Sequence, residues 1–238
     1  AQHIGMPWGF YVELDDRNWP YQQNPKEASA ECAYTAIAQG ADYLNSFIHR
    51  HGTGTDSRPE RWDFTGQEMR KIRRIGPLLT RTARPPSRVA MIYPMAQAMI
   101  NNGHRPADYA LECLRHGFGM VDAVSSEVLG EKDALSDRDA FVLLGCDILE
   151  RELADKLTEF VEKGGLLVLD QVPPTDVKSQ PLELPWQFEG IEPKALPGLP
   201  DCAYRVLTWQ QGTVTLLDFD LNEAYREAVE EDMFKRAA

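Results

Sequence analysis

Short apolar runs alternate with helix-like patterns along most of this chain. In the second half the runs are nearly continuous, as in 140–144, which is typical of strands buried on both faces of a parallel sheet. The segment that follows, 148–163, places its apolar residues at helical spacing and ends at Gly164-Gly165, which suits a helix C-terminus. This alternation predicts an α/β protein.

The region after residue 87 predicts a parallel-sheet domain. Its expected strands begin near Val89, Val121, Phe141 and Leu166. Helices are expected over about 107–116 and 148–163 and in an acidic amphipathic segment at the end of the chain. Two further apolar segments, 204–209 and 213–217, flank Gln210-Gln211-Gly212 and predict a β-hairpin.

The region before residue 87 predicts two strand–helix units, the pattern of a (β/α) barrel. Strands are expected at 8–13 and 41–48, a helix at about 25–39, and a second helix that begins near Thr65. Gly76-Pro77 is expected to break or kink this second helix. Because prolines bias the chain towards extended structure, Arg84-Pro85-Pro86 marks the boundary between a region 1–87 and a region 88–238.

Charge and composition narrow the classes of function. The chain of 238 residues has a formal net charge of -12, which disfavours binding to nucleic acid and to anionic membrane surfaces. No apolar segment is long enough to span a bilayer, and the first residues do not have the pattern of a signal peptide. The four cysteines form no CxxC pair and no disulfide framework, so we expect reduced, mostly buried thiols in a cytoplasmic protein. No glycine-rich phosphate loop is found, and no cofactor is expected.

Three stretches carry a resemblance to a known family. The first is Tyr11-Val12-Glu13 followed by Asn18-Trp19, and the second is 38–42, Ala-Gln-Gly-Ala-Asp, followed by Phe47-Ile48-His49-Arg50. The third is 160–168, a helix end, a double glycine and a strand. In this order they resemble the second half of the family 42 glycoside hydrolases, the β-galactosidases with (β/α)8 barrels.

The resemblance implies a fold and an activity. The fold class is α/β: a partial (β/α) barrel remnant made of its last two βα units at 1–87, then a flavodoxin-like parallel-sheet domain at 88–238. In the family this second domain is similar to class I glutamine amidotransferases and is often called the trimerisation domain. The resemblance therefore implies a carbohydrate substrate and, as protein partner, either a homo-oligomer such as a trimer or the missing half of the barrel.

Glu13 is the catalytic candidate, because it matches the family's nucleophile at the end of the seventh barrel strand. Retaining glycosidases need two carboxylates, a nucleophile and an acid/base. The family's acid/base follows an Asn on an earlier strand, and no Asn-Glu pair precedes Glu13. This chain alone is therefore expected to be inactive. Asp15 and Asp16 are alternative carboxylates, and a surface Glu that begins a loop is the other interpretation of Glu13.

Four residues are candidates for contact with a sugar. Trp19 could stack on a sugar ring, and the cluster His49, Arg50 and His51 could donate hydrogen bonds to hydroxyl groups. His49 stands where the family has a tryptophan. The other interpretation is a loop stabilised by nearby aspartates. His49 and His51 could share one face of an extended chain, but no third ligand stands near them, so no metal site is expected.

The second domain could carry a nucleophile of its own. Gly145-Cys146-Asp147 lies between an expected strand and an expected helix, but amidotransferases also need a downstream His, and none follows His116. Cys146 is therefore interpreted as a buried apolar residue. The basic residues of 70–74 are interpreted as a solvated helix face, or as a surface that docks on an acidic partner chain. The alternative function for the whole chain is a non-catalytic oligomerisation or ligand-binding module.

Overall fold

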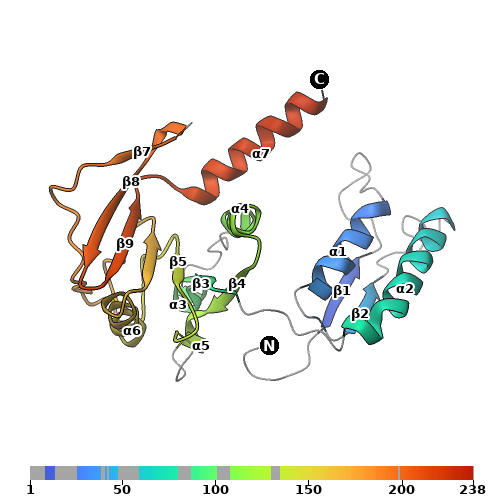
Figure 1. The fold of residues 1–238 in the computed structure, drawn as a ribbon, viewed down its shortest axis with the longest axis horizontal. Helices are drawn as coiled ribbons and strands as arrows, with labels where there is room; N and C mark the ends of the chain where they lie inside the picture. Colours follow the sequence, from blue (N-terminus) through green and yellow to red (C-terminus); the bar gives the residue numbers. More distant parts are fainter. Residues whose placement is uncertain are drawn as a thin grey trace. The chain divides into compact units, whose positions relative to one another are not determined.

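The computed structural model describes residues 9–13, 26–38, 41, 43–47, 59–79, 87–100, 108–129, 135–197 and 199–237. The chain forms two compact units, Ala1–Pro85 and Pro86–Ala238 (Figure 1).

The first unit is two successive strand–helix pairs. Its elements are β1 (Gly9–Glu13), α1 (Lys26–Ala38), β2 (Tyr43–Phe47) and α2 (Pro59–Leu79). Strands β1 and β2 pair in parallel, with Gly9 beside Tyr43 and Glu13 beside Phe47. Because parallel neighbours need a crossover connection, α1 links the two strands as a βαβ unit.

Helix α2 is longer than its pattern predicted. It begins at Pro59, ahead of the expected start near Thr65, because proline at the first helical position has no N–H that a helix would leave unbonded. The helix includes Gly76 and Pro77 and ends at Leu79, so Pro77 lies in its last turn. The helix was expected to break or kink at Gly76-Pro77, and it ends two residues after this proline.

The described core of the first unit is small. Ala33 of α1 is fully buried against Leu44, Met69 and Ile72. A polar contact adds to it: the Tyr34 hydroxyl donates to Glu68 Oε2 at 2.9 Å, and Lys71 Nζ donates to Glu68 Oε1 at 2.5 Å. The hydrogen bonds from Lys71 and Tyr34 lower the pKa of Glu68. Helices α1 and α2 are therefore joined by both apolar packing and a charged hydrogen-bonded link.

The second unit is built on a seven-stranded sheet in the order β4-β3-β5-β6-β9-β8-β7. The first five strands in that order run parallel, β8 is antiparallel to β9, and β7 is antiparallel to β8. The strands are β3 (Val89–Tyr93), β4 (Val121–Ser125), β5 (Ala140–Leu143), β6 (Leu166–Leu169), β7 (Lys194–Leu196), β8 (Leu199–Trp209) and β9 (Gly212–Leu217). The parallel part has the flavodoxin-like order 2-1-3-4-5, so the predicted fold class is confirmed.

The antiparallel edge comes from the predicted hairpin. Strands β8 and β9 pair from Tyr204 with Leu217 to Trp209 with Gly212, and Gln210 in the turn has φ 53°. Positive φ is what two-residue hairpin turns require. The short strand β7, which the sequence pattern did not predict, extends the sheet beyond the hairpin.

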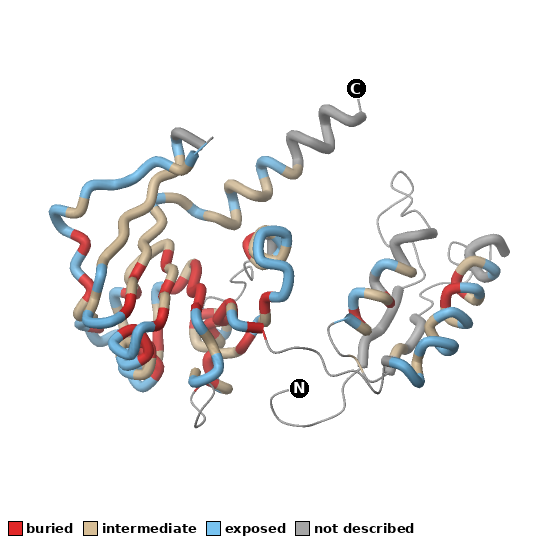
Figure 2. Tube along the Cα trace, viewed as in Figure 1, coloured by how far each residue is buried: buried red, intermediate tan, exposed pale blue. Residues whose placement is uncertain are grey.

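Side chains alternate between the two faces of the sheet. On β5, Phe141 and Leu143 join the larger core under α6 (Arg151–Glu162), and the Phe141 and Phe160 rings meet edge to face with centroids 4.9 Å apart. Val142 and Leu144 face the other way, into the smaller core under α4 (Asp108–Phe118). Buried residues accordingly follow the central strands in Figure 2.

The remaining helices are α3 (Met95–Ile100), α5 (Ser126–Leu129) and α7 (Leu221–Ala237). Helices α3 and α5 are too short to show a helical period and were not predicted. Helix α7 packs on α4, where Tyr225 Oη lies 2.7 Å from His116 Nδ1 and Ala110 N–H donates to Asn222 Oδ1 at 3.2 Å. In the part of the chain that the structure describes, no helix combines the length and the hydropathy needed to cross a membrane.

Candidate functional site

The first candidate site is the carboxyl end of β1. Glu13 is the last residue of β1, and it pairs with Phe47, the last residue of β2. Both strands of this parallel pair therefore end at the same edge, where βα barrels place their catalytic residues. The side chain of Glu13 lies outside the described residues.

The other residues predicted for this site fall on undescribed segments. Trp19, His49, Arg50 and His51 all lie outside the described residues, as do Asp15 and Asp16. The structure thus places the backbone of one predicted site residue, Glu13, at a strand end.

A second candidate site lies in the second unit, at the carboxyl edge of its sheet. An open cleft of about 1050 Å³ lies there, over the ends of β5, β6 and β9. Its polar lining includes Gln97, Asp147, Asp170, Gln171, Arg205 and Asp220. Ligands of open α/β sheets bind outside the carboxyl ends of the strands, and this cleft lies at that edge.

Two glutamines hold Asp147 in this cleft. Gln97 Nε2 donates to Asp147 Oδ2 at 3.0 Å, and Gln171 Nε2 donates to Asp147 Oδ1 at 2.9 Å. Gln97 is only 2% exposed, and its Oε1 accepts the N–H groups of Asp147 and Ile148. Because a buried amide must find partners, Gln97 fixes the turn after β5 to the start of α3.

Asp170, the residue after β6, closes the floor of the cleft. Its two carboxylate oxygens accept the Gly145 N–H at 2.8 and 2.9 Å. Burial raises the pKa of Asp170, and the hydrogen bond from Gly145 acts in the opposite direction. Gly145 itself has φ 58°, a left-handed conformation that glycine adopts without steric cost.

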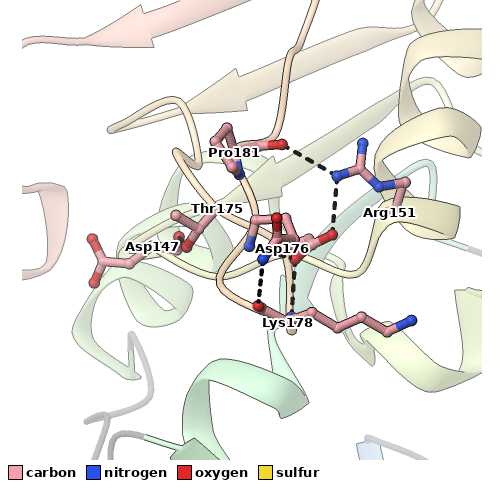
Figure 3. A network of polar contacts seen from close by, with 7 residues as sticks. Asp147, Arg151, Thr175, Asp176, Lys178 and Pro181 are labelled. Carbon is pink, nitrogen blue, oxygen red and sulfur yellow. Dashed lines mark hydrogen bonds and ion pairs between the residues drawn. The ribbon is translucent and has the colours of Figure 1, made fainter.

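A polar network fixes the loop that follows β6 (Figure 3). Asp176 is 6% exposed, and its Oδ1 accepts the N–H groups of Lys178 and Gln180 at 2.9 Å. Arg151 Nη2 donates to Asp176 Oδ2 at 2.9 Å and to the Pro181 carbonyl at 3.2 Å. These hydrogen bonds lower the pKa of Asp176. Thr175 Oγ1 donates to the Asp147 carbonyl at 3.2 Å, so the same loop supports the Asp147 turn.

Cys146 is not placed as a nucleophile. It is fully buried in the larger core, and its Sγ donates to the Ile148 carbonyl at 3.3 Å. Burial raises the pKa of its thiol to about 12, so at neutral pH the sulfur is protonated. The described thiols are all free, but Cys113 and Cys202 are half-buried, so the expectation of mostly buried thiols is wrong for these two.

Among the described residues, no group of three or more His, Cys, Asp or Glu side chains is arranged to hold a metal ion. Gln97, Asp147, Asp170 and Gln171 were missed as cleft residues by the sequence analysis. A signal was present, because Asp170 directly follows the apolar run 166–169, Gln171 comes next, and Asp147 lies three residues after the run 140–144. Gln97 carries no such signal, since its helix was not predicted.

No family model matches the sequence, and no curated protein is significantly similar to it. Solved structures nevertheless share its fold. The β-galactosidase from Bacillus circulans sp. alkalophilus has a TM-score of 0.62 and 13% identity over 94% of this chain and 45% of its own. The β-galactosidase from the Antarctic haloarchaeon Halorubrum lacusprofundi has a TM-score of 0.55 and 18% identity, covering 98% of this chain and 44% of its own.

A third structure is the apo exo-carrageenase GH42 from Bacteroides ovatus. It has a TM-score of 0.55 and 12% identity, over 91% of this chain and 28% of its own. The chain thus spans less than half the length of these structures. The matches confirm the predicted resemblance at the level of fold: the chain has the fold of the C-terminal part of family 42 glycoside hydrolases.

Proposed function

We propose that this chain is the C-terminal part of a glycoside-hydrolase-like protein that acts on carbohydrate, with Glu13 as the nucleophile of the complete enzyme. The supporting observation is the position of Glu13 at the carboxyl end of β1, in a fold shared with β-galactosidases. A carboxylate at that end of a barrel strand points to catalysis, whereas one at the opposite end points to stability.

The proposed chemistry is the retaining mechanism. The Glu13 carboxylate attacks the anomeric carbon while a second carboxylic acid protonates the departing oxygen, so a glycosyl–enzyme ester forms as the glycosidic bond breaks. The second carboxylate, now a base, takes a proton from water, and the water oxygen displaces Glu13. This acid/base group must come from barrel strands other than β1 and β2. Trp19, His49, Arg50 and His51 are proposed to contact the sugar.

The first unit also needs a protein neighbour. Among the described residues, β1 and β2 form a two-stranded sheet, which leaves one edge of each strand without a strand partner. Unpaired edges attract further strands, and two strands alone are marginally stable. We propose that the remaining barrel strands complete this sheet, and that the assembled protein is a homo-oligomer, for example a trimer.

Trapping of the covalent intermediate tests the role of Glu13. The polypeptide of the complete reading frame is incubated with a 2-deoxy-2-fluoro galactoside that has a good leaving group, and its peptides are analysed by mass spectrometry. We expect one fluoroglycosyl adduct, on the peptide that contains Glu13, and no adduct in Glu13→Gln. Glu31→Gln on the exposed face of α1 is the matched control and should still be labelled. An adduct on another carboxylate, or activity retained in Glu13→Gln, would refute the assignment.

The alternative function is a non-catalytic oligomerisation or ligand-binding module. It is favoured by the second unit, which has a complete two-faced core and an open cleft but a buried, protonated Cys146 in place of a nucleophile. Absence of hydrolysis and of labelling in the complete polypeptide, together with a defined oligomer, would support this alternative.

A further inference from the structure

A hydrogen bond crosses the topological switch point of the second sheet. Strands β3 and β5 are neighbours, but the chain leaves β3 towards β4 on one side and leaves β5 towards β6 on the other. Open α/β sheets bind ligands at such a point, outside the carboxyl ends of the strands. Here Gln97, on the helix that follows β3, donates to Asp147, in the turn that follows β5. Both residues line the open cleft of about 1050 Å³.

Asp147 offers two acceptor positions side by side. Each oxygen of a carboxylate can accept about two hydrogen bonds. Among the described residues, Gln97 occupies one position on Oδ2 and Gln171 occupies one on Oδ1. The second position on each oxygen remains, and Asp147 is exposed to solvent. Because the two amides fix the carboxylate, these positions match the O–H donors of two adjacent hydroxyl groups.

The rest of the cleft wall combines hydrogen-bonding groups with apolar side chains. Arg205 supplies N–H donors, and the carboxyl groups of Asp170 and Asp220 supply acceptors. The apolar lining consists of Val172, Pro193, Leu216, Leu217 and Phe219. A sugar ring has the same combination, because its hydroxyl groups both donate and accept while its faces carry C–H groups.

The charge of the cleft favours an uncharged ligand. Among the described residues that line it, four are aspartates and one is an arginine, so an anion would be repelled. The aspartates already have partners that offset their charge or their burial. Asp218 Oδ1 lies 3.2 Å from Arg205 Nη2, Asp220 accepts a backbone N–H of α7 at 3.0 Å, and Asp170 accepts the Gly145 N–H. No cation is therefore required to complete the site.

We propose that this cleft binds an uncharged saccharide through two adjacent hydroxyl groups, both of which donate to Asp147. Gln171 orients the Asp147 carboxylate at the mouth of the turn, and the apolar lining packs on the sugar ring. Ligand pockets usually measure about 300–1,000 Å³, so the cleft has room for a disaccharide. All of its lining residues belong to the second unit, and the proposal does not depend on Glu13 or on hydrolysis.

Saturation-transfer difference NMR of the 238-residue chain with lactose tests the binding. Lactose should bind with a Kd near about 1 mM. The Kd should change by less than about twofold between about 50 and about 500 mM NaCl, because salt does not screen a neutral ligand. Fully O-methylated lactose has the same rings without O–H donors and should not bind. Agmatine, a guanidinium compound, is the charged comparison and should not bind either.

Substitutions in the cleft locate the ligand. Asp147→Asn replaces one acceptor oxygen by an NH₂ donor and should raise the Kd for lactose by about tenfold or more. Gln171→Ala removes an amide that orients Asp147 and should raise it by about threefold or more. Asp155→Asn and Gln211→Ala make the same changes at exposed positions outside the cleft and should leave the Kd unchanged. Circular dichroism of each variant shows whether it is folded, and Gln171→Ala decides the matter if Asp147→Asn is not.

Four results would overturn the proposal. The first is no saturation transfer to lactose at up to about 20 mM. The second is equal Kd values for Asp147→Asn and Asp155→Asn. The third is binding of agmatine in place of lactose, which would assign the cleft to organic cations. The fourth is binding that is lost in Trp19→Ala and kept in Asp147→Asn, which would place the sugar in the first unit. Covalent labelling of Glu13 is a separate measurement, so either proposal can fail while the other stands.

Discussion

At the scale of single residues, burial decides what the polar groups at the carboxyl edge of the second sheet can do. Cys146 and Asp170 are held at neighbouring strand ends, and burial raises the pKa of both. Burial disfavours the charged form of each side chain, the thiolate of Cys146 and the carboxylate of Asp170. The thiolate is the reactive form of a cysteine. The carboxyl edge of the sheet therefore has the cleft and the polar groups of a ligand site. None of its described residues is an activated nucleophile.

The Cys146 thiol should resist alkylation in the folded protein. With a pKa of about 12 and no exposed surface, it offers almost no thiolate at pH 8. Half-buried Cys113 and Cys202 provide internal comparison. Iodoacetamide treatment followed by peptide mass spectrometry should modify these two first and Cys146 only after denaturant is added. Modification of Cys146 at the rate of Cys202 in the folded protein would contradict this assignment.

Asp170→Asn should gain stability relative to the unchanged protein as the pH rises. Because the folded-state pKa of Asp170 is raised, the folded chain retains a proton that the unfolded chain loses above about pH 4. The unchanged protein therefore loses stability between the unfolded and the folded pKa, whereas the neutral Asn does not titrate and can still accept the Gly145 N–H. Thermal melts at pH 4 and pH 7 should show the difference in Tm move in favour of Asn, and exposed Asp155→Asn should show no such shift. A difference that moves the other way would mean that the carboxylate itself stabilises the turn.

The burial of Cys146 was predicted from the sequence, whereas the role of Gln97 was not. Cys146 was interpreted as a buried apolar residue because no histidine follows His116 to act as the base of a nucleophile. Gln97 was missed because its partners, the N–H groups of Asp147 and Ile148, lie about fifty positions away in the chain. Such a contact exists only after β3 and β5 have paired, so no local pattern could indicate it.

At the scale of elements, the close approach of β9 to the end of α6 depends on Gly212. A Cβ atom at this position would lie 2.0 Å from the Val161 carbonyl oxygen and 2.5 Å from that of Gly165, both backbone atoms. The β8–β9 hairpin and the α6–β6 turn can therefore meet only through a glycine. Neither backbone can move without disturbing the pairing of Thr213 with Leu166.

Gly212→Ala should destabilise the second unit by about 2–4 kcal/mol, because a methyl group must displace backbone. Gly117→Ala in α4 is the matched control: its Cβ meets nothing within 4 Å, and alanine is favoured over glycine in a helix by about 0.5–1 kcal/mol. Urea unfolding monitored by circular dichroism compares the two variants. Equal stability of both would show that β9 can move away from α6 at little cost.

The elements that sequence predicted well are those with a long or repeated pattern. The expected strands at Val89, Val121, Phe141 and Leu166 begin within one residue of the observed ones. Helices α3 and α5 span six and four residues, too few for a period of 3.6 to be recognised. Strand β7 is equally short, and it forms only because the edge of β8 is available to pair with it.

At the scale of the whole molecule, fold and function were predictable to different depths. The order of apolar runs and helices gave the α/β class, and the three motif stretches gave the resemblance that the structural matches confirm at the level of fold. A catalytic site is not fixed by fold alone, because it requires side chains from several strands to converge. Of the predicted site residues, the structure describes the backbone position of Glu13 and no other.

The 238-residue chain by itself should release no nitrophenol from nitrophenyl β-galactoside. Retaining hydrolysis needs a second carboxyl group about 5–5.5 Å from the nucleophile. In the family that this chain resembles, that group follows an Asn on an earlier strand, and no Asn-Glu pair precedes Glu13 in this chain. Absorbance assays at micromolar protein should give the same rate for the unchanged chain, for Glu13→Gln and for buffer. Hydrolysis by the unchanged chain that disappears in Glu13→Gln would show that an acid/base is supplied within this chain, and Asp15 and Asp16 would then be the first residues to substitute.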